Sequence, residues 1–292
     1  MSSSVLTRPT APLDPPPPDY QRRAGIGVDD LPIPSRTARA RTRAARAVTA
    51  SAAIVVFAGL WEVAPRLGLV DRVFLPPLSS ALAALGDLAA SGELWVHVRA
   101  SVSRALVGLS IAVAAAVPLG ALIGRSPRVA RFLSPLLELF RNTAALALLP
   151  VFVLILGIGE TSKVALVVYA CFFPILLSTI TGVRTVDPLL VKSARSLGIR
   201  PVALFTKVTL PAAVPTIFTG IRMAGAASIL VLVAAEMVGA RAGLGYLVTA
   251  SQQNFQIPAM YAGILAIAFV GIAINTALLL IERRVSRWRP AA

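Results

Sequence analysis

Cysteine, histidine and acidic residues are scarce in this chain, and their scarcity excludes several kinds of site. The 292 residues include one cysteine, Cys171, and one histidine, His97, so the chain forms no internal disulfide and has no cluster of thiol and imidazole ligands for zinc. No pair of carboxylates stands out, and no serine lies in a nucleophile elbow. We expect neither a metal site nor a catalytic site, and we expect His97 to lie at the surface.

Charge is also sparse, and it is unevenly divided between the two signs. Charged residues make up 14% of the chain and hydrophobic residues 57%, and 28 lysines and arginines outnumber 13 aspartates and glutamates. A soluble domain of this length would carry more charge. The basic excess does not indicate nucleic-acid binding, because the aromatic residues lie inside apolar runs and not between basic residues. We therefore expect contact with a lipid bilayer and not with nucleic acid.

Long apolar runs are what the chain has in abundance. Most are about 17 to 25 residues long, the length that an α-helix needs to cross the apolar core of a bilayer. Pro118, Pro150 and Pro174 lie inside three of these runs, which favours a bundle whose helices satisfy each other's freed carbonyls over a single-helix anchor. The predicted fold is an all-α integral membrane protein with six spans, at about residues 47–64, 105–123, 142–158, 164–180, 212–240 and 262–281.

The two ends of the chain differ from this apolar body. Residues 1–46 are rich in Pro, Ser, Ala and Arg and cannot bury a core, so they predict a disordered tail. Residues 47–92 are expected to hold the first span and a loop on the far side of the membrane. Residues 282–292 are expected to form a second, basic tail.

The basic residues predict how the spans are oriented. Most of them lie in the two tails and in the loops between spans 2 and 3 and between spans 4 and 5. With six spans these segments share one side, and their excess of lysine and arginine marks that side as cytoplasmic. We therefore expect a multi-pass protein of the cell (inner) membrane with both termini in the cytoplasm.

The loop between spans 4 and 5, residues 187–211, is polar and predicts two short helices. Asp187 is suited to cap the first helix, and Pro188 suits its first turn. Gly198 suits its end, and Pro201 can open the second helix. An ordered loop on the cytoplasmic side indicates a surface that contacts a partner.

This loop resembles the EAA motif of the permeases of ATP-binding-cassette (ABC) importers, which runs Glu-Ala-Ala, three residues, Gly, nine residues, Ile, one residue, Leu-Pro. The spacing from its glycine to its proline agrees in full, whereas lysine and serine stand where the motif has glutamate and its first alanine. The matching segment contains Lys192, Ser193, Ala194, Arg195, Gly198, Val208, Leu210 and Pro211. The flanks resemble the branch of this family that transports nitrate, sulfonates and taurine, at residues 157–166, 172–188 and 235–247.

The resemblance covers about residues 93–281 and implies a type I ABC importer permease domain, with a coupling helix between spans 4 and 5. It implies three partners: cytoplasmic ATPase subunits on the coupling helices, an extracytoplasmic solute-binding protein and a second permease copy. The branch implies a small anion as solute, an aliphatic sulfonate first and taurine or nitrate next, although it also includes permeases for thiamine precursors.

The chain is expected to carry no cofactor and no ATP site of its own. The stretch GIGETSK at residues 157–163 has glycines followed by a lysine, but a phosphate-binding P-loop needs glycine directly before that lysine, and Ser162 stands there. The resemblance implies that ATP binds to the partner ATPase.

Three polar residues in or beside the spans are candidates for the solute pathway. Glu236 lies near the outer end of span 5, where it either lines or gates the pathway or holds the turn at residues 243–245 by hydrogen bonds. Arg141 and Asn142 open span 3, where they either attract an anion or anchor the span at the interface. The rival class, an ion-coupled secondary transporter, would need several ionisable residues within the membrane, and Glu236 is nearly alone.

Overall fold

The computed structural model of the protein describes residues 52–285, and the chain divides into two units, Met1–Leu60 and Trp61–Ala292. The predicted tail at residues 1–46 and the end of the basic tail at residues 286–292 lie outside the described residues. In the first unit, residues 52–60 are helical, as the first predicted span requires. All other described residues belong to the second unit.

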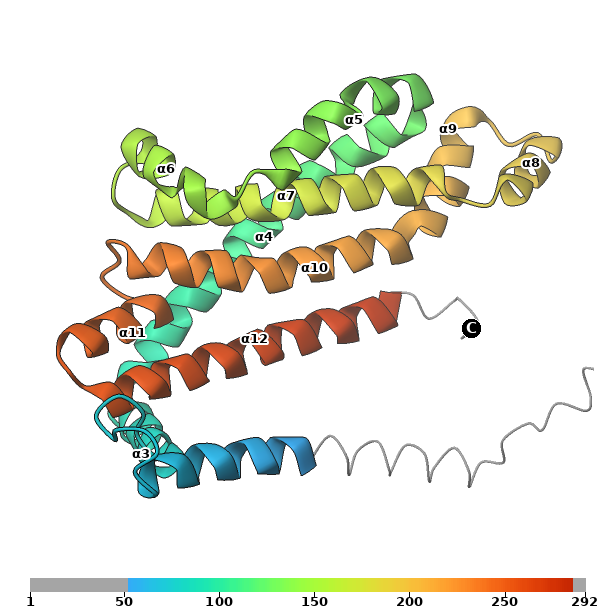
Figure 1. Ribbon diagram of the computed structural model, residues 1–292. Coiled ribbons are helices and arrows are strands. Elements are labelled where there is room, and N and C mark those ends of the chain that lie inside the picture. The colour runs from blue at the N-terminus through green and yellow to red at the C-terminus, as the bar shows by residue number, and fades with distance from the viewer. Residues whose placement is uncertain (1–51, 286–292) are drawn as a thin grey trace, which may run out of the picture. The chain divides into compact units, whose positions relative to one another are not determined.

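Helices account for the regular secondary structure of the second unit between residues 61 and 285 (Figure 1). Residues 61–66 are helical, and a loop then leads to the elements that carry the rest of the unit. In chain order these are α3 (Leu78–Ala90), α4 (Glu93–Arg125), α5 (Pro127–Asn142), the 3-10 helix η2 (Ala145–Leu148), α6 (Leu149–Leu156), α7 (Glu160–Arg184), α8 (Pro188–Ser196), α9 (Pro201–Leu204), the π turn η3 (Phe205–Thr209), α10 (Leu210–Met237), α11 (Leu244–Gln253) and α12 (Ile257–Val285).

The core of the second unit lies between α4, α7 and α10. Figure 1 shows α7, α10 and α12 running side by side, with α4 crossing them. On α4, a Cβ atom at Gly108 would come within 2.6 Å of Val167, and one at Gly120 within 2.8 Å of Thr179. Because both positions are glycine, the backbones of α4 and α7 can approach closely, as small residues allow between membrane helices.

The predicted all-α membrane fold is confirmed. Among residues 52–285, four helical runs are long and apolar enough to cross a bilayer: α4, α7, the run Pro201–Met237 and α12. A fifth crossing is present if α5 is counted together with η2 and α6. Because the first predicted span begins at residue 47, outside the described part of the chain, the total of six remains a prediction.

The third span, predicted at about residues 142–158, is shorter than predicted. Its helical part is Ala145–Leu156, which is long enough to cross a bilayer only if it is counted together with α5. Helix α5 ends at Asn142, Thr143 and Ala144 are extended, and the chain bends by 80° before the apolar residues of η2 and α6. Pro150 lies in the first turn of α6 and not in the middle of a helix. A proline is well placed there, because the first turn needs no backbone N–H donor.

Candidate functional site

Two polar sites lie at opposite ends of α7 and α10. Glu160 begins α7 and Glu236 lies in the last turn of α10, whereas residues 187–211 join the other ends of the two helices. Figure 1 shows α8 and α9 at this second end, with α6 and α11 at the first. At 1.5 Å per residue, the 25 residues of α7 separate the two sites by about 37 Å.

The first half of the segment 187–211 has the predicted local structure. The Asp187 carboxylate accepts a hydrogen bond from the backbone N–H of Leu189 at 2.8 Å, and Pro188 lies in the first turn of α8. Gly198 follows the helix with a φ of 75°, in the left-handed region that favours glycine. The cap, the first-turn proline and the terminating glycine are therefore confirmed.

The second half of the segment is shorter than a separate helix and is continuous with α10. Helix α9 has only four residues and passes through the π turn η3 directly into α10. Pro211 lies in the first turn of α10, where its missing N–H fits a local change in hydrogen-bonding pattern. Because Leu210 packs against the main core, a displacement of α9 would act on a membrane-spanning helix.

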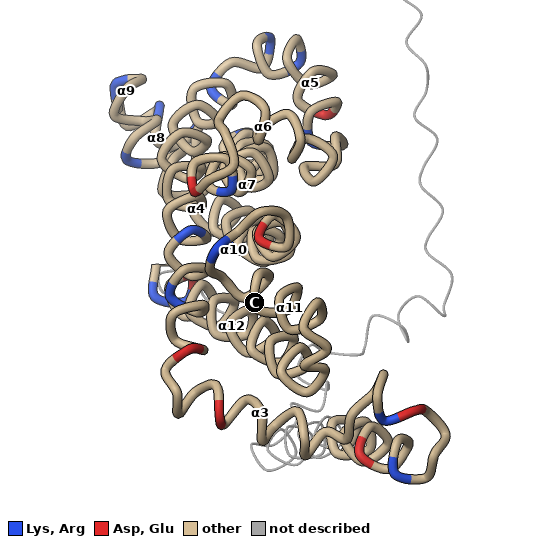
Figure 2. Tube along the Cα trace, turned by 90° about the vertical axis from the view of Figure 1, so that its left-hand side faces the viewer, with Lys and Arg blue, Asp and Glu red and all other residues tan. Residues whose placement is uncertain are grey.

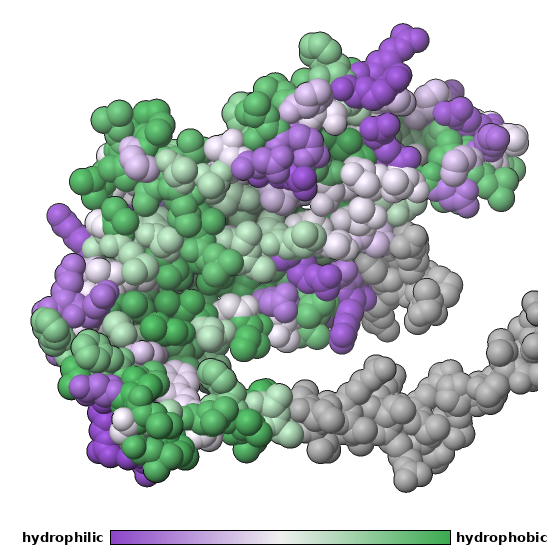
Figure 3. All heavy atoms as spheres, in the orientation of Figure 1, coloured by the Kyte–Doolittle hydropathy of each residue, from purple (hydrophilic) through white to green (hydrophobic). Residues whose placement is uncertain are grey.

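The residues that match the motif differ in exposure along this segment. Helix α8 packs against α9 and η3, so both halves of the motif lie together. Figure 2 shows lysines and arginines around α8 and α9, and Figure 3 shows hydrophilic atoms at this end of the second unit. Ala194 is buried, Lys192, Ser193, Arg195 and Gly198 are exposed, and Val208, Leu210 and Pro211 are half-buried. Their role in contacting an ATPase stays a prediction.

At the opposite end, Glu236 is fully buried and paired. Its carboxylate accepts hydrogen bonds from Arg104 at 2.6 Å, from the Ser101 hydroxyl at 2.8 and 2.9 Å, and from the backbone N–H of Gly245 at 3.0 Å. The Arg104 guanidinium also forms two hydrogen bonds to the Glu160 carboxylate. We call Ser101, Arg104, Glu160 and Glu236 the Glu236 cluster. It joins α4, α7 and α10, and it places a carboxylate at the positive N-terminal end of α11.

The turn at residues 238–243 is held by side chains from the surrounding helices. Arg104 donates to the carbonyl of Ala242 at 2.7 Å, and Lys163 donates to the carbonyl of Gly239 at 3.3 Å. The N–H of Gly243 donates to Nδ1 of His97 at 3.1 Å. The expectation that His97 lies at the surface was therefore wrong, because its imidazole is buried as an acceptor for this turn. Of the two roles considered for Glu236, the hydrogen bond with residues 243–245 is present, because the backbone N–H of Gly245 donates to its carboxylate at 3.0 Å.

Gly245→Ala is expected to lower the free energy of unfolding by about 1–3 kcal/mol, the usual cost of overpacking. A Cβ atom at Gly245 would lie 2.2 Å from the carbonyl oxygen of Val233, a backbone atom that cannot rotate away. Gly271→Ala in α12 is the matched control, since no atom lies within 4 Å of its added methyl group. Denaturant unfolding of the detergent-solubilised protein measures the free energy of unfolding of both variants. Equal stability would contradict the close packing of Gly245 against Val233.

Arg141 and Asn142 lie at the break between α5 and η2, whereas Glu236 lies in the last turn of α10. They line a hollow of about 260 Å³ together with Thr143, Tyr169 and residues of α10. Arg141 pairs with Glu138 at 2.8 Å, and both side chains are about half exposed. Glu236 does not line this hollow, so the structure separates the three residues proposed for the pathway into two places.

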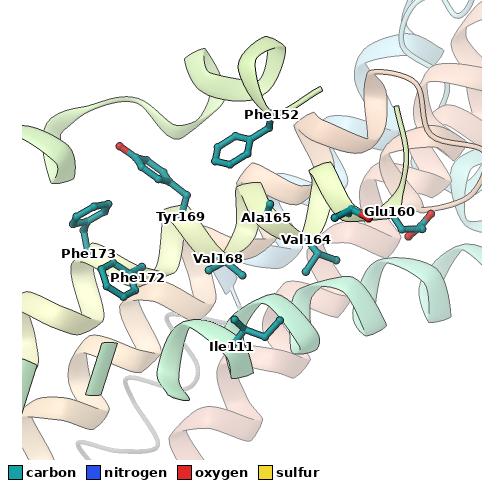
Figure 4. Close-up of a pocket in the computed structure, with 10 residues that line it drawn as sticks. Ile111, Phe152, Glu160, Val164, Ala165, Val168, Tyr169, Phe172 and Phe173 are labelled. Carbon is teal, nitrogen blue, oxygen red and sulfur yellow. The ribbon is translucent and has the colours of Figure 1, made fainter. Parts of the chain in front are cut away.

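A larger hollow of about 710 Å³ lies between α4, α6 and α7 (Figure 4). Its lining is almost wholly apolar, and its aromatic rings come from two helices: Phe152 from α6, and Tyr169, Phe172 and Phe173 from α7. Glu160 lies at its edge, and its carboxylate is already bound to Arg104. This hollow therefore offers no unpaired cation to an anion.

Sequence reasoning missed Arg104 and Ser101, although their spacing contains a signal. His97, Ser101 and Arg104 are four and three residues apart, so they lie on one face of α4. These three residues precede the apolar run from which the second span was predicted. Because that run begins after Arg104, it did not indicate that the helix starts as early as Glu93. The partners on α7 and α10 are 56 and 132 residues away, a separation that local patterns do not encode.

The fold defines a multi-pass helical membrane protein in which the segment 187–211 is continuous with the long apolar helix α10. Residues 116–288 match the family described as binding-protein-dependent transport system inner membrane component, and the chain belongs to that family.

Similarity to individual proteins of this kind supports the same family. The taurine transport system permease protein TauC of Escherichia coli K12 is 35% identical over 260 residues, which cover 87% of this chain and 94% of TauC. The putative aliphatic sulfonates transport permease protein SsuC of Bacillus subtilis 168 is 35% identical over 234 residues, 80% of this chain and 85% of SsuC. A chain in the MetNI methionine ABC transporter, solved in inward-facing conformations, matches with a TM-score of 0.59 at 20% identity over 66% of this chain and 97% of that chain, which shows a shared fold.

Proposed function

We propose that this chain is the membrane-spanning permease subunit of an ABC importer for an aliphatic sulfonate or a related small anion such as taurine or nitrate. The observation that carries the proposal is the 35% identity to a taurine permease over 94% of that protein's length. The aliphatic-sulfonate permease at the same level of identity supports the same class of solute.

The proposed assembly has separate parts for energy, delivery and passage. ATP is bound and hydrolysed by cytoplasmic ATPase subunits, an extracytoplasmic binding protein delivers the solute, and a second copy of this chain completes the pathway. Both termini and the segment 187–211 lie in the cytoplasm, so α8 acts as the coupling helix. The continuity of α9, η3 and α10 supports this role, because it lets motion at the segment reach a membrane span.

Uptake into proteoliposomes tests this function. The permease is reconstituted with its ATPase and binding protein, and entry of radiolabelled taurine or an alkanesulfonate is followed with ATP on the ATPase side. We expect uptake that requires ATP hydrolysis. Uptake driven by a proton or sodium gradient without ATP would instead identify the rival class, a secondary transporter. The Arg104 pairing of Glu236 disfavours that rival, because it leaves the carboxylate no site for a coupling ion.

The break between α5 and η2 is the proposed place where the anion passes. Discontinuous helices bind solutes within several transporter folds, because their free backbone ends and polar side chains face the pathway. Arg141 can release Glu138 and bind a sulfonate in its place. The cost is small, because the Arg141–Glu138 pair is exposed and surface ion pairs contribute little stability. Asn142 and Thr143 add hydrogen-bonding groups to the same hollow.

Arg141→Gln is expected to raise the KM for uptake about tenfold, because a charge-assisted hydrogen bond to the anion contributes roughly 1.5–3 kcal/mol. Arg131→Gln on the same helix is the control, since Arg131 is exposed and does not line the hollow. Uptake measured over a range of solute concentrations checks the shift. An unchanged KM in Arg141→Gln would remove this arginine from the pathway.

A further inference from the structure

A hollow of about 650 Å³ lies where the ends of α4 and α7 meet α8 and α9. Its lining carries four cations, one from each of α4 and α7 and two from α8: Arg125, Arg184, Lys192 and Arg195. Apolar residues such as Val183, Val191 and Leu204 form the rest of its wall. The hollow therefore combines an apolar wall with a concentration of positive charge.

These cations lack carboxylate partners within residues 52–285. None of the four forms an ion pair there, and Arg125 instead lies 6.0 Å from the centre of the Phe205 ring. The segment 187–211 contains one acidic residue, Asp187. Its carboxylate is already used to cap α8, so the segment offers these exposed cations no other carboxylate of its own.

Large apolar side chains are exposed beside this hollow. Leu189 is 69% exposed, Leu197 is 81% exposed and Val202 is 66% exposed. Apolar side chains next to a charged rim are the usual composition of a protein–protein interface, in which the apolar centre supplies binding energy and the charges supply specificity. An anionic lipid headgroup would engage only the cations. The tail at residues 1–46 is a poor match, because its arginines outnumber its aspartates.

We propose that this cationic pocket receives carboxylate side chains of the ATPase subunit, so that the permease and the ATPase assemble through an acidic patch on the ATPase. The inference rests on the proposed function and specifies the chemistry of its partner. It also gives Lys192 a role: the lysine contributes to a pocket of one charge sign, and the matching acid lies on the other protein. Assembly through such a pocket is strengthened at low ionic strength and weakened by salt.

Charge reversal on α8 tests the proposal. The full-length permease, in detergent or nanodiscs, is titrated with its cognate ATPase, and the dissociation constant is measured at low salt and at about 0.5 M salt. We expect Lys192→Glu with Arg195→Glu to weaken binding at least about tenfold at low salt, with a smaller loss at high salt. The neutral pair Lys192→Gln with Arg195→Gln should fall between the reversed variant and the wild type.

Arg128→Glu with Arg131→Glu is the matched control, since it makes the same change in net charge on α5, outside the pocket. A lysine substitution of one acid on the ATPase that restores binding to the reversed variant would locate the contact. The inference is overturned if the reversed variant binds the ATPase as tightly as the wild type. It is also overturned if reversal only reduces binding to phosphatidylglycerol vesicles. A wild-type permease that binds no ATPase would contradict the proposed function itself.

Discussion

Arg104→Met is expected to destabilise the protein by about 3–5 kcal/mol, because it leaves the Glu236 carboxylate buried without its cation. The Glu236 side chain has no exposed surface and that of Arg104 is 6% exposed, so water cannot replace the lost contact. The same substitution also removes the hydrogen bond that Arg104 donates to Ala242 at 2.7 Å. The loss should therefore loosen the turn at residues 238–243 as well as the junction of α4, α7 and α10.

Arg99→Met is the matched control for this prediction. Arg99 lies on the same helix but is exposed, so its replacement removes the same charge without exposing a buried partner. Denaturant unfolding in detergent gives the free-energy difference between the two variants. Equal stability of Arg104→Met and Arg99→Met would show that the Glu236 cluster does not hold the helices together.

Glu236→Gln separates the two roles that the sequence left open for this residue. The amide keeps the size of the side chain and one oxygen for the Gly245 N–H, while Arg104 keeps its hydrogen bonds to Glu160. We therefore expect a smaller loss of stability than in Arg104→Met and an assembled complex. Impaired uptake in that complex would indicate a gating role, and normal uptake would leave Glu236 a structural residue.

The sequence predicted best those features that depend on neighbouring residues. The cap at Asp187, the proline at the start of α8 and the left-handed glycine at Gly198 each act within one helical turn, and all three are confirmed. The all-α membrane architecture also follows from local apolar runs. The 80° bend at Thr143 did not follow, because the polar residues Arg141, Asn142 and Thr143 indicate the end of an apolar run but not the angle at which the chain continues.

The Glu236 cluster shows why contacts between distant helices could not be predicted from the sequence. Its acid was recognised as too costly to face lipid, and a hydrogen bond to the turn at residues 243–245 was one of the two roles considered for it. Its main partner, Arg104, lies 132 residues away on a helix that begins at Glu93, before the second predicted span at residues 105–123. The pairing depends on how closely α4 packs against α7 and α10, which is a property of the assembled bundle.

The same two helices, α7 and α10, join the two polar sites. A movement of the segment 187–211 could therefore reach the Glu236 cluster through either helix. Helix α7 runs from the Glu236 cluster to α8, and α10 runs from η3 back to the cluster. A rotation of α8 can therefore act on both helices at once if the turn between α8 and α9 stays rigid. Gly198 supplies the left-handed backbone of the turn between α8 and α9, so we expect a substitution there to change how the two helices meet.

Gly198→Val is expected to uncouple ATP hydrolysis from uptake or to prevent the ATPase from docking. No atom lies within 4 Å of a Cβ added at this position, so the substitution causes no collision, and its whole effect comes from the φ of 75°. A β-branched residue is strongly disfavoured there, at a cost of roughly 1–3 kcal/mol, and the turn should rearrange to relieve it. The ratio of ATP hydrolysed to solute imported in proteoliposomes measures the coupling.

Gly157→Val is a matched control because Gly157 has a φ of 80° and the same open space but joins α6 to α7 at the opposite end. Its ψ of 169° places it in a region that essentially only glycine adopts. The substitution therefore strains the backbone there without touching the segment 187–211, so it should retain coupling. Gly198→Asn should also retain coupling, because asparagine tolerates the left-handed conformation. Wild-type coupling in Gly198→Val, or equal losses in Gly157→Val and Gly198→Val, would show that the geometry of this turn does not carry the signal from the ATPase to the spans.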